Sequence, residues 1–135
     1  MATISFIALA VVDIEAAADF YSKVFDLKSP DRLTGFVALE TGATKLGLYP
    51  WDELAHDAGV SASRADGFRG ITLCHNVASR EGVDEIFSRA CQADGTSVKS
   101  PTDTSWGGYS GYFADPDGHL WEVTWNPNYP LESGV

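Results

Sequence analysis

The sequence is poor in basic residues and in cysteine. Nine Lys and Arg stand against nineteen Asp and Glu, so the formal net charge is -10. Such a chain repels a phosphate backbone, and we therefore expect no nucleic-acid partner. Cys74 and Cys91 have neither C-x-x-C spacing nor companion cysteines for a disulfide scaffold. We expect both to be reduced thiols packed in the interior.

Long apolar runs and several catalytic motifs are also missing. The N-terminal apolar stretch has no basic residues before it and meets Asp13 too soon to span a bilayer. We therefore expect no membrane association and a cytoplasmic location. Neither a phosphate-cradling glycine loop nor a Ser-His-Asp set is recognisable, which argues against nucleotide use and nucleophilic hydrolysis. The composition, 44% hydrophobic and 21% charged over 135 residues, is that of one globular domain.

The first half of the chain has the pattern of a strand, a helix and further strands. The run at 4–12 is apolar and partly β-branched, which predicts a strand buried on both faces. Asp13 can cap the helix that follows, in which the apolar residues of 14–25 fall on one stripe. Two more strands are expected at 35–40 and 45–49, joined by a turn.

The second half repeats this order. A strand is expected at 70–77, and Ser79 can cap a helix that Gly95 ends. A short strand at 96–99 then stops at the break Ser100-Pro101, before a final hairpin. Each unit would leave an apolar sheet face that it cannot bury alone, and pairing the two halves solves that problem.

The chain is therefore predicted to form a single domain over residues 1–135. Its first half is 1–50, its second half is 68–135, and a linker at 51–67 joins them. Periodic apolar residues disappear in the linker, where the segment WDELAHDA can form one or two helical turns.

The segment GYFADPDGHLWEVTWNP is the most informative stretch of the chain. A two-residue type I′ hairpin turn is excluded, because the ring of Pro116 cannot adopt the positive φ that this turn requires. Pro116 and Asp117 suit the centre of a type I turn, with Gly118 in the left-handed region as a bulge. This turn places Asp115 opposite His119.

The resulting register sorts the side chains of the hairpin onto two faces, because residues that face each other share a side of the sheet. Tyr112 faces Glu122, and together with Thr124 they form the candidate cavity face. The other face is expected to pack against a helix, and it holds Phe113, Trp121, Val123 and Trp125.

This hairpin, together with the opening FIALAVVDIEAAADFYSKVFDL, resembles the vicinal-oxygen-chelate superfamily of glyoxalases, bleomycin-resistance proteins and dioxygenases. The resemblance covers nearly the whole chain, and the ending looks most like a little-characterised, glyoxalase-like branch. It implies an α+β fold in which two βαβββ modules form a cupped mixed sheet of eight strands around a ligand-sized cavity. A homodimer is one assembly that it implies, although this chain already holds two modules.

In the metalloenzymes that the chain resembles, a divalent metal inside the cup binds vicinal oxygens of the substrate, and His or Glu ligands occupy four sites. These sites correspond here to Phe6, roughly Gly47, Gly70 and Glu122, of which only Glu122 can bind a metal. His75 lies five residues after Gly70 and so on the opposite strand face, unless a bulge reverses it. We therefore expect no metal or other cofactor; if a metal binds, its ligand is Glu122.

Aromatic residues at strand ends and on the candidate cavity face form a second set of candidates. Flat rings with polar tips can stack on a planar or cationic ligand, and Trp106 beside Gly107-Gly108 would suit the lip of a pocket. At least two of these rings are expected to be core or rim packing instead. The predicted ligand-binding residues are Tyr49, Trp51, His75, Trp106, Tyr109, Tyr112 and Glu122.

Three functions remain open. The first is a metal-independent protein that sequesters a small organic molecule, as bleomycin-type resistance proteins do; the acidic balance and the missing ligands favour it. The second is a lactoylglutathione-lyase-like isomerase or an extradiol-dioxygenase-like oxygenase, with Glu122 as metal ligand or general base. The third is a metal-free enzyme with two catalytic residues, Glu122 as base and Tyr112 as proton donor.

Overall fold

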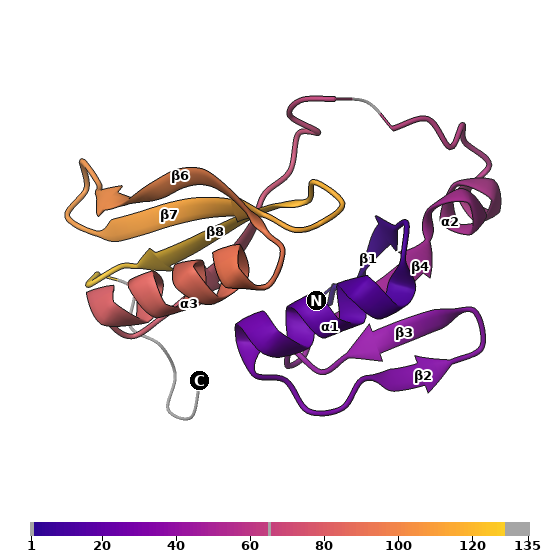
Figure 1. Ribbon diagram of the computed structural model, residues 1–135, viewed down its shortest axis with the longest axis horizontal. Helices are drawn as coiled ribbons and strands as arrows, with labels where there is room; N and C mark the ends of the chain where they lie inside the picture. Colours follow the sequence, from indigo (N-terminus) through magenta and orange to yellow (C-terminus); the bar gives the residue numbers. More distant parts are fainter. Residues whose placement is uncertain (1, 65, 129–135) are drawn as a thin grey trace. The chain divides into compact units, whose positions relative to one another are not determined.

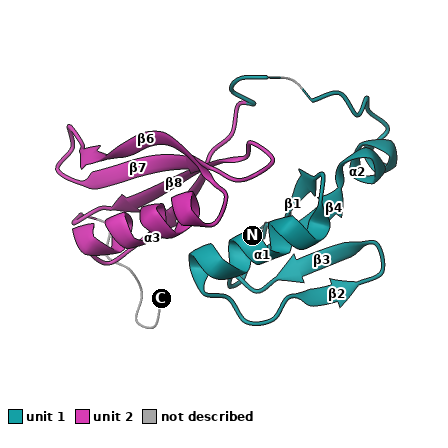
Figure 2. Cartoon of the chain, in the orientation of Figure 1, with its two compact units in different colours: residues 1–69 teal, residues 70–135 magenta. Residues whose placement is uncertain are grey.

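A computed structural model describes residues 2–64 and 66–128 of the chain. The chain divides into two compact units, residues 1–69 and 70–135 (Figure 2). The first unit runs strand, helix, three strands and a second helix, and the second unit runs strand, helix and three strands (Figure 1). The predicted α+β class with two βαβββ modules is therefore confirmed. Each helix in the described ranges is too short or too polar to cross a membrane.

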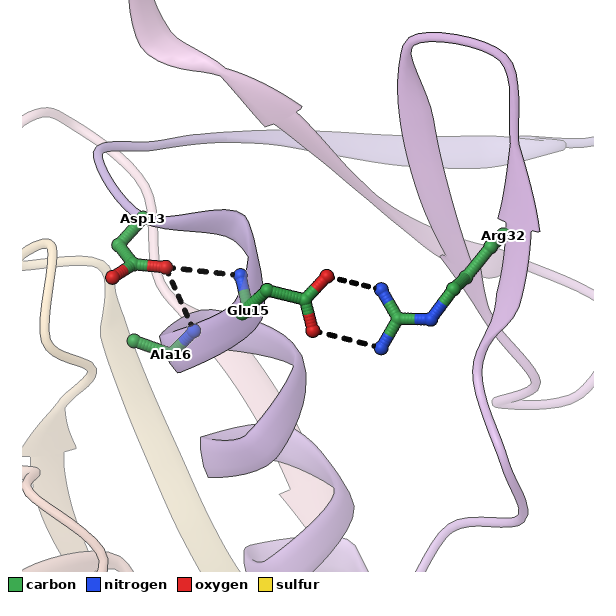
Figure 3. Close-up of polar contacts among 4 residues, drawn as sticks. All are labelled: Asp13, Glu15, Ala16 and Arg32. Atoms are coloured by element: carbon green, nitrogen blue, oxygen red, sulfur yellow. Dashed lines mark hydrogen bonds and ion pairs between the residues drawn. The ribbon is translucent and has the colours of Figure 1, made fainter.

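The first unit has a four-stranded sheet of order β1-β4-β3-β2, in which β1 and β4 are parallel. Helix α1 begins where Asp13 accepts hydrogen bonds from the backbone N–H groups of Glu15 and Ala16, at 3.1 and 3.0 Å (Figure 3). The guanidinium group of Arg32 in β2 donates two hydrogen bonds to the carboxylate of Glu15. The elements are β1 (Phe6–Val11), α1 (Ile14–Phe25), β2 (Asp31–Leu33), β3 (Phe36–Leu39), β4 (Lys45–Pro50) and α2 (Trp51–Ala58).

Two features of this unit differ from the sequence pattern. Strand β2 is three exposed residues long, so it has no apolar alternation by which it could be recognised. Strand β1 is not buried on both faces, because Leu9 and Val11 are buried whereas Phe6 is 42% exposed. The predicted turns of WDELAHDA, in contrast, are confirmed as α2.

The second unit has a sheet of order β5-β8-β7-β6, and α3 packs on β6, β7 and β8 (Figure 1). Ser79 caps α3 as predicted by accepting a hydrogen bond from the backbone N–H of Gly82, at 3.0 Å. The elements are β5 (Leu73–Asn76), α3 (Arg80–Gln92), β6 (Thr96–Asp103), β7 (Tyr109–Ala114) and β8 (Leu120–Trp125).

One predicted boundary in the second unit is wrong, and another is confirmed. Strand β6 does not stop before Pro101 but continues to Asp103; it lies at the sheet edge, where proline is tolerated, and its register shifts on both sides of Lys99. Gly95 ends α3 as predicted, because its backbone N–H donates to the carbonyl of Ala90 at 2.8 Å. The left-handed residue before it is Asp94, with φ 82°.

Each unit buries apolar residues between its helix and its sheet, and each large side chain so buried contributes about 1.5–3 kcal/mol. The first core includes Phe20, Tyr21, Val24, Leu46 and Leu48, and the second includes Val83, Ile86, Phe113, Trp121 and Val123.

Both cysteines are free thiols, as predicted, but the expectation that they pack in the interior is wrong because both are exposed. Cys91 lies at the margin of the α3 stripe, which is buried at Val83, Ile86 and Ala90. Cys74 lies on β5 directly beside Glu122 of β8, and so on the sheet face opposite to Val123 and α3.

Candidate functional site on the open face of the second sheet

The β7–β8 hairpin has the predicted turn. The backbone N–H of Asp115 donates to the carbonyl of His119 at 2.9 Å, and that of Gly118 donates to the carbonyl of Asp115 at 3.0 Å. Gly118 has a φ of +85°, which confirms its left-handed conformation. The Asp115 carboxylate is buried and accepts from the backbone N–H groups of Asp117 and His119, at 2.9 and 2.7 Å. This turn fixes the register of the two strands.

The register brings four side chains into one line across the sheet, which we call the Glu122 row. Tyr112 pairs with Glu122 across β7 and β8, as predicted, and Cys74 of β5 pairs with Glu122 from the other side. Lys99 of β6 pairs with Tyr112. Because paired residues share a face, the Glu122 row lies on the side of the sheet away from α3, and we call that side the open face.

The Glu122 carboxylate lies at the centre of the row. Tyr112 lies beside this carboxylate, and desolvation, followed by the charge of Glu122 and hydrogen bonding to it, raises the pKa of the Tyr112 phenol. Cys74 lies on the other side of Glu122, and the same causes in the same order raise the pKa of its thiol to about 11. Both groups therefore keep their protons at neutral pH, and neither is a ready nucleophile.

The surroundings of the Glu122 row are polar on one side and apolar on the other. Ser110 and Thr124 pair on the open face and are 6% and 5% exposed, and Asn76 pairs with Thr124. The Cys74 thiol donates a hydrogen bond to Oδ1 of Asn76 at 3.4 Å. On the other side of the row, Ala114 pairs with Leu120. The Glu122 row thus lies between Asn76 with two buried hydroxyl residues on one side and a small apolar surface on the other.

His75 is not part of the Glu122 row. It pairs with Val123, so it lies on the face toward α3, opposite to Glu122, as the parity of the strand predicts. Burial lowers the pKa of its imidazole. No bulge turns this histidine toward Glu122.

The structure also separates Tyr109 from the Glu122 row, because Tyr109 shares the face of Phe113. Its O–H donates to Oδ1 of Asp84 at 2.7 Å, and the guanidinium of Arg80 lies 4.9 Å from the centroid of its ring. Arg80 also forms an ion pair with Asp103 at 2.6 Å. These contacts join the first turns of α3 to β6 and β7, so they give Tyr109 a structural role.

Trp106 lies over its neighbouring glycine. A Cβ atom added to Gly108 would be 2.1 Å from Cζ3 of the Trp106 ring, so only glycine permits this packing. The ring is nevertheless 46% exposed. Trp106 therefore offers an aromatic surface at the start of β7, in keeping with its predicted place at a strand entrance.

Two of the predicted residues, Tyr49 and Trp51, belong to the first unit. Tyr49 stacks on Phe36, with ring centroids 4.8 Å apart. The guanidinium groups of Arg64 and Arg69 lie 5.3 and 5.2 Å from the centroid of the Trp51 ring. The Trp51 indole N–H donates to the carbonyl of Ala62 at 3.0 Å. Trp51 is therefore in contact with the segment that follows α2, which leaves less of its ring for a ligand.

Tyr49 also reaches a cleft of about 480 Å³ within the first unit. The cleft is lined by Gly35, Tyr49, Leu54, His56 and three carboxylates, Asp52, Glu53 and Asp57.

The four positions at which related metalloenzymes hold their metal do not provide a suitable donor set. Phe6 and Gly47 are neighbours on the first sheet, since a Cβ on Gly47 would lie 3.5 Å from Cδ1 of Phe6. Ala8 pairs with Gly47 in the first sheet, and Cys74 pairs with Glu122 in the second, so Ala8 and Cys74 occupy equivalent positions. Thr72 precedes Cys74 by two residues, as Phe6 precedes Ala8. The residue equivalent to Phe6 is therefore Thr72, which corrects the predicted position Gly70. Among the described residues, no group of three or more His, Cys, Asp or Glu could hold a metal ion.

The sequence pattern missed two members of the Glu122 row. Cys74 was assigned to the interior, although its even spacing from Asn76 and Thr72 is the signal that these side chains share a face. Lys99 was read only as the end of a strand. Lys99 lies beside Tyr112 because the strand register shifts after Ser97, and the sequence pattern does not predict this shift.

Comparison with known proteins agrees with this architecture. A sequence profile of the Glyoxalase/Bleomycin resistance protein/Dioxygenase superfamily matches residues 3–123. An uncharacterized protein of Mycobacterium bovis is 30% identical over 121 residues, 85% of this chain and 78% of that protein. A glyoxalase-related enzyme from Fulvimarina pelagi is 30% identical, with a TM-score of 0.89 over 98% of this chain and 94% of the other. A lactoylglutathione lyase from Agrobacterium tumefaciens is 27% identical, with a TM-score of 0.71 over 98% and 99%.

Proposed function

Because the chain belongs to the Glyoxalase/Bleomycin resistance protein/Dioxygenase superfamily, we propose that it binds a small organic molecule against the Glu122 row, without a metal, and sequesters it. The observation that carries this proposal is the half-buried Glu122 carboxylate on the face that α3 leaves open. In the described part of the chain Glu122 has no ion-pair partner, so its charge is available to a ligand.

The neighbours of Glu122 within the row leave acceptor capacity on its carboxylate. A carboxylate has about four lone-pair sites, and the protonated side chains beside it, Tyr112 and Cys74, leave sites open to a ligand. Glu122 lies on a strand between these two cross-strand neighbours, which restricts its side chain and lowers the entropy that a ligand loses on binding. Glu122 is therefore a preorganised acceptor for an N–H or O–H group of a ligand.

Binding without a metal follows from the donor chemistry. Of Phe6, Gly47, Thr72 and Glu122, only Glu122 offers a strong metal ligand. Cys74 lies beside Glu122, but a thiol with a pKa of about 11 must lose its proton before it can bind a metal. The superfamily's metal chemistry requires more ligands than this face supplies, and no step of the proposed function depends on a metal.

A second candidate is a metal-free lyase or isomerase. The likeness to a lactoylglutathione lyase favours it, as does the cross-strand pairing of Tyr112 with Glu122. Glu122 would remove a proton from a carbon next to a carbonyl, and Tyr112 would donate its phenolic proton to the developing oxyanion. Binding of a ligand that is released unchanged favours sequestration, whereas exchange of such a proton with solvent deuterium favours the enzyme.

The test combines metal analysis with a thermal-shift screen of small organic molecules. Glu122→Gln and Tyr112→Phe are compared with the wild-type protein and with Glu81→Gln, which makes the same charge change at an exposed position of α3. We expect ligands that bind the wild type and Glu81→Gln but bind Glu122→Gln at least ~10-fold more weakly, because hydrogen bonds to a charged group are worth about 1.5–3 kcal/mol. Equal binding by Glu122→Gln, or stoichiometric metal that binding requires, would contradict the proposal.

A further inference from the structure

The Glu122 row contains one acid and one base that the chain itself leaves unneutralised. Within residues 2–64 and 66–128, ion pairs join acidic residues to Lys23, Arg32, Lys45, Arg80 and Arg89. Neither Lys99 nor Glu122 takes part in such a pair. A carboxylate and an ammonium group on one open face, both without an ion-pair partner, are the charge pattern that complements a ligand with two opposite charges.

The spacing of the two charges favours a bridging ligand over a direct ion pair. Lys99 is on β6 and Glu122 is on β8, with Tyr112 of β7 between them. Neighbouring strands are about 4.8 Å apart, so the two backbones are separated by about 10 Å. A small molecule lying across Tyr112 can place one charged group at each end.

We propose that the ligand of the Glu122 row is a small amphoteric molecule, with a cationic nitrogen that binds Glu122 and an acidic group that binds Lys99. This inference rests on the proposed function and specifies its ligand class. A purely anionic ligand would be repelled by Glu122, and a purely cationic one would leave Lys99 unused. The pair of Ala114 and Leu120 provides an apolar surface beside the row for the part of the ligand that joins the two charges.

The test uses three matched probes whose binding is measured by calorimetry. 4-(Aminomethyl)benzoic acid carries both charges, its methyl ester lacks the acid, and 4-methylbenzoic acid lacks the amine. We expect the amphoteric probe to bind the wild-type protein at least about 10-fold more tightly than either of the other two probes. In Lys99→Gln the amphoteric probe should bind no more tightly than the ester, and in Lys99→Arg its higher affinity should return. In Glu122→Gln it should bind no more tightly than 4-methylbenzoic acid.

The control is Lys28→Gln, which removes an exposed lysine of the first unit and should leave all three affinities unchanged. Thermal unfolding confirms that each variant is folded. The inference is overturned if the amphoteric probe fails to bind the wild type, or if its advantage over the ester persists in Lys99→Gln. Ligands that need Glu122 but carry no acid would reject the inference and leave the proposed function intact, whereas loss of all dependence on Glu122 would reject both.

Discussion

The open faces of the two sheets occupy the same place in two copies of one topology, yet their chemistry differs. The first sheet turns Phe6, Phe36 and Tyr49 to the side away from α1, around Gly47. In the second sheet the position that corresponds to Gly47 is Glu122, which lies between Cys74 and Tyr112. One face is aromatic and the other is polar.

The faces toward the helices, in contrast, are alike. Leu46 and Leu48 of β4 are buried in the first unit, as Trp121 and Val123 of β8 are in the second. Burial of these positions holds each module together, so only apolar residues serve there. The open face is under no such requirement. The comparison teaches that a duplicated module keeps its helix-facing residues apolar and can use the other face for recognition.

The largest expected difference between the modules lies in their hairpin turns. Asp115→Ala leaves two backbone N–H groups without their buried acceptor and should lower the free energy of unfolding by about 2–3 kcal/mol. Thr41→Ala removes an exposed hydrogen bond of 2.6 Å to the carbonyl of Thr44 in the corresponding turn of the first module, and should lower it by about 0.5 kcal/mol. Urea denaturation of both variants measures the difference, and equal values would contradict it.

An intermediate effect is expected from the aromatic face. Phe36→Leu keeps an apolar side chain but removes the stack with Tyr49, which is 4.8 Å between centroids and 7° between planes. The loss should be about 1 kcal/mol in the free energy of unfolding. Phe68→Leu is the matched control, because Phe68 is 74% exposed and should tolerate the change. If both variants lost the same stability, the stack would have no special contribution.

The last expected effect concerns the chemical reactivity of the Cys74 thiol. A rise in pKa from 9.0 to about 11 means that about a hundredfold less thiolate is present at pH 8. In a Cys91→Ser background, alkylation by iodoacetamide should therefore be slow and should rise about tenfold per pH unit up to pH 10. Glu122→Gln removes a negative charge that raises this pKa, so it should accelerate the reaction, whereas Glu81→Gln should not. A rate that levels off near pH 9 would show an ordinary thiol.

The local pattern predicted the parts of the candidate site that depend on neighbouring residues. Pro116 and Gly118 restrict the turn, and the turn sets which residues of β7 and β8 face each other, so Tyr112 and Glu122 were paired correctly. Parity along β5 placed His75 on the other face for the same reason. Turn chemistry and strand parity do not predict contacts between different elements. Examples are the contact of Tyr109 with α3 and the contacts of Trp51 with Arg64 and Arg69.

By itself, the sequence determined two modules, their capped helices and the register of the final hairpin, because caps, turns and side-chain periodicity act over a few residues. Only the tertiary structure decided that Cys74 and Lys99 join Glu122 and Tyr112 in one row. Cys74 reaches Glu122 through parallel pairing of strands far apart in the chain, and Lys99 reaches Tyr112 through a shift of register. Such pairings depend on how whole strands pack, and that information lies in no short segment of the chain.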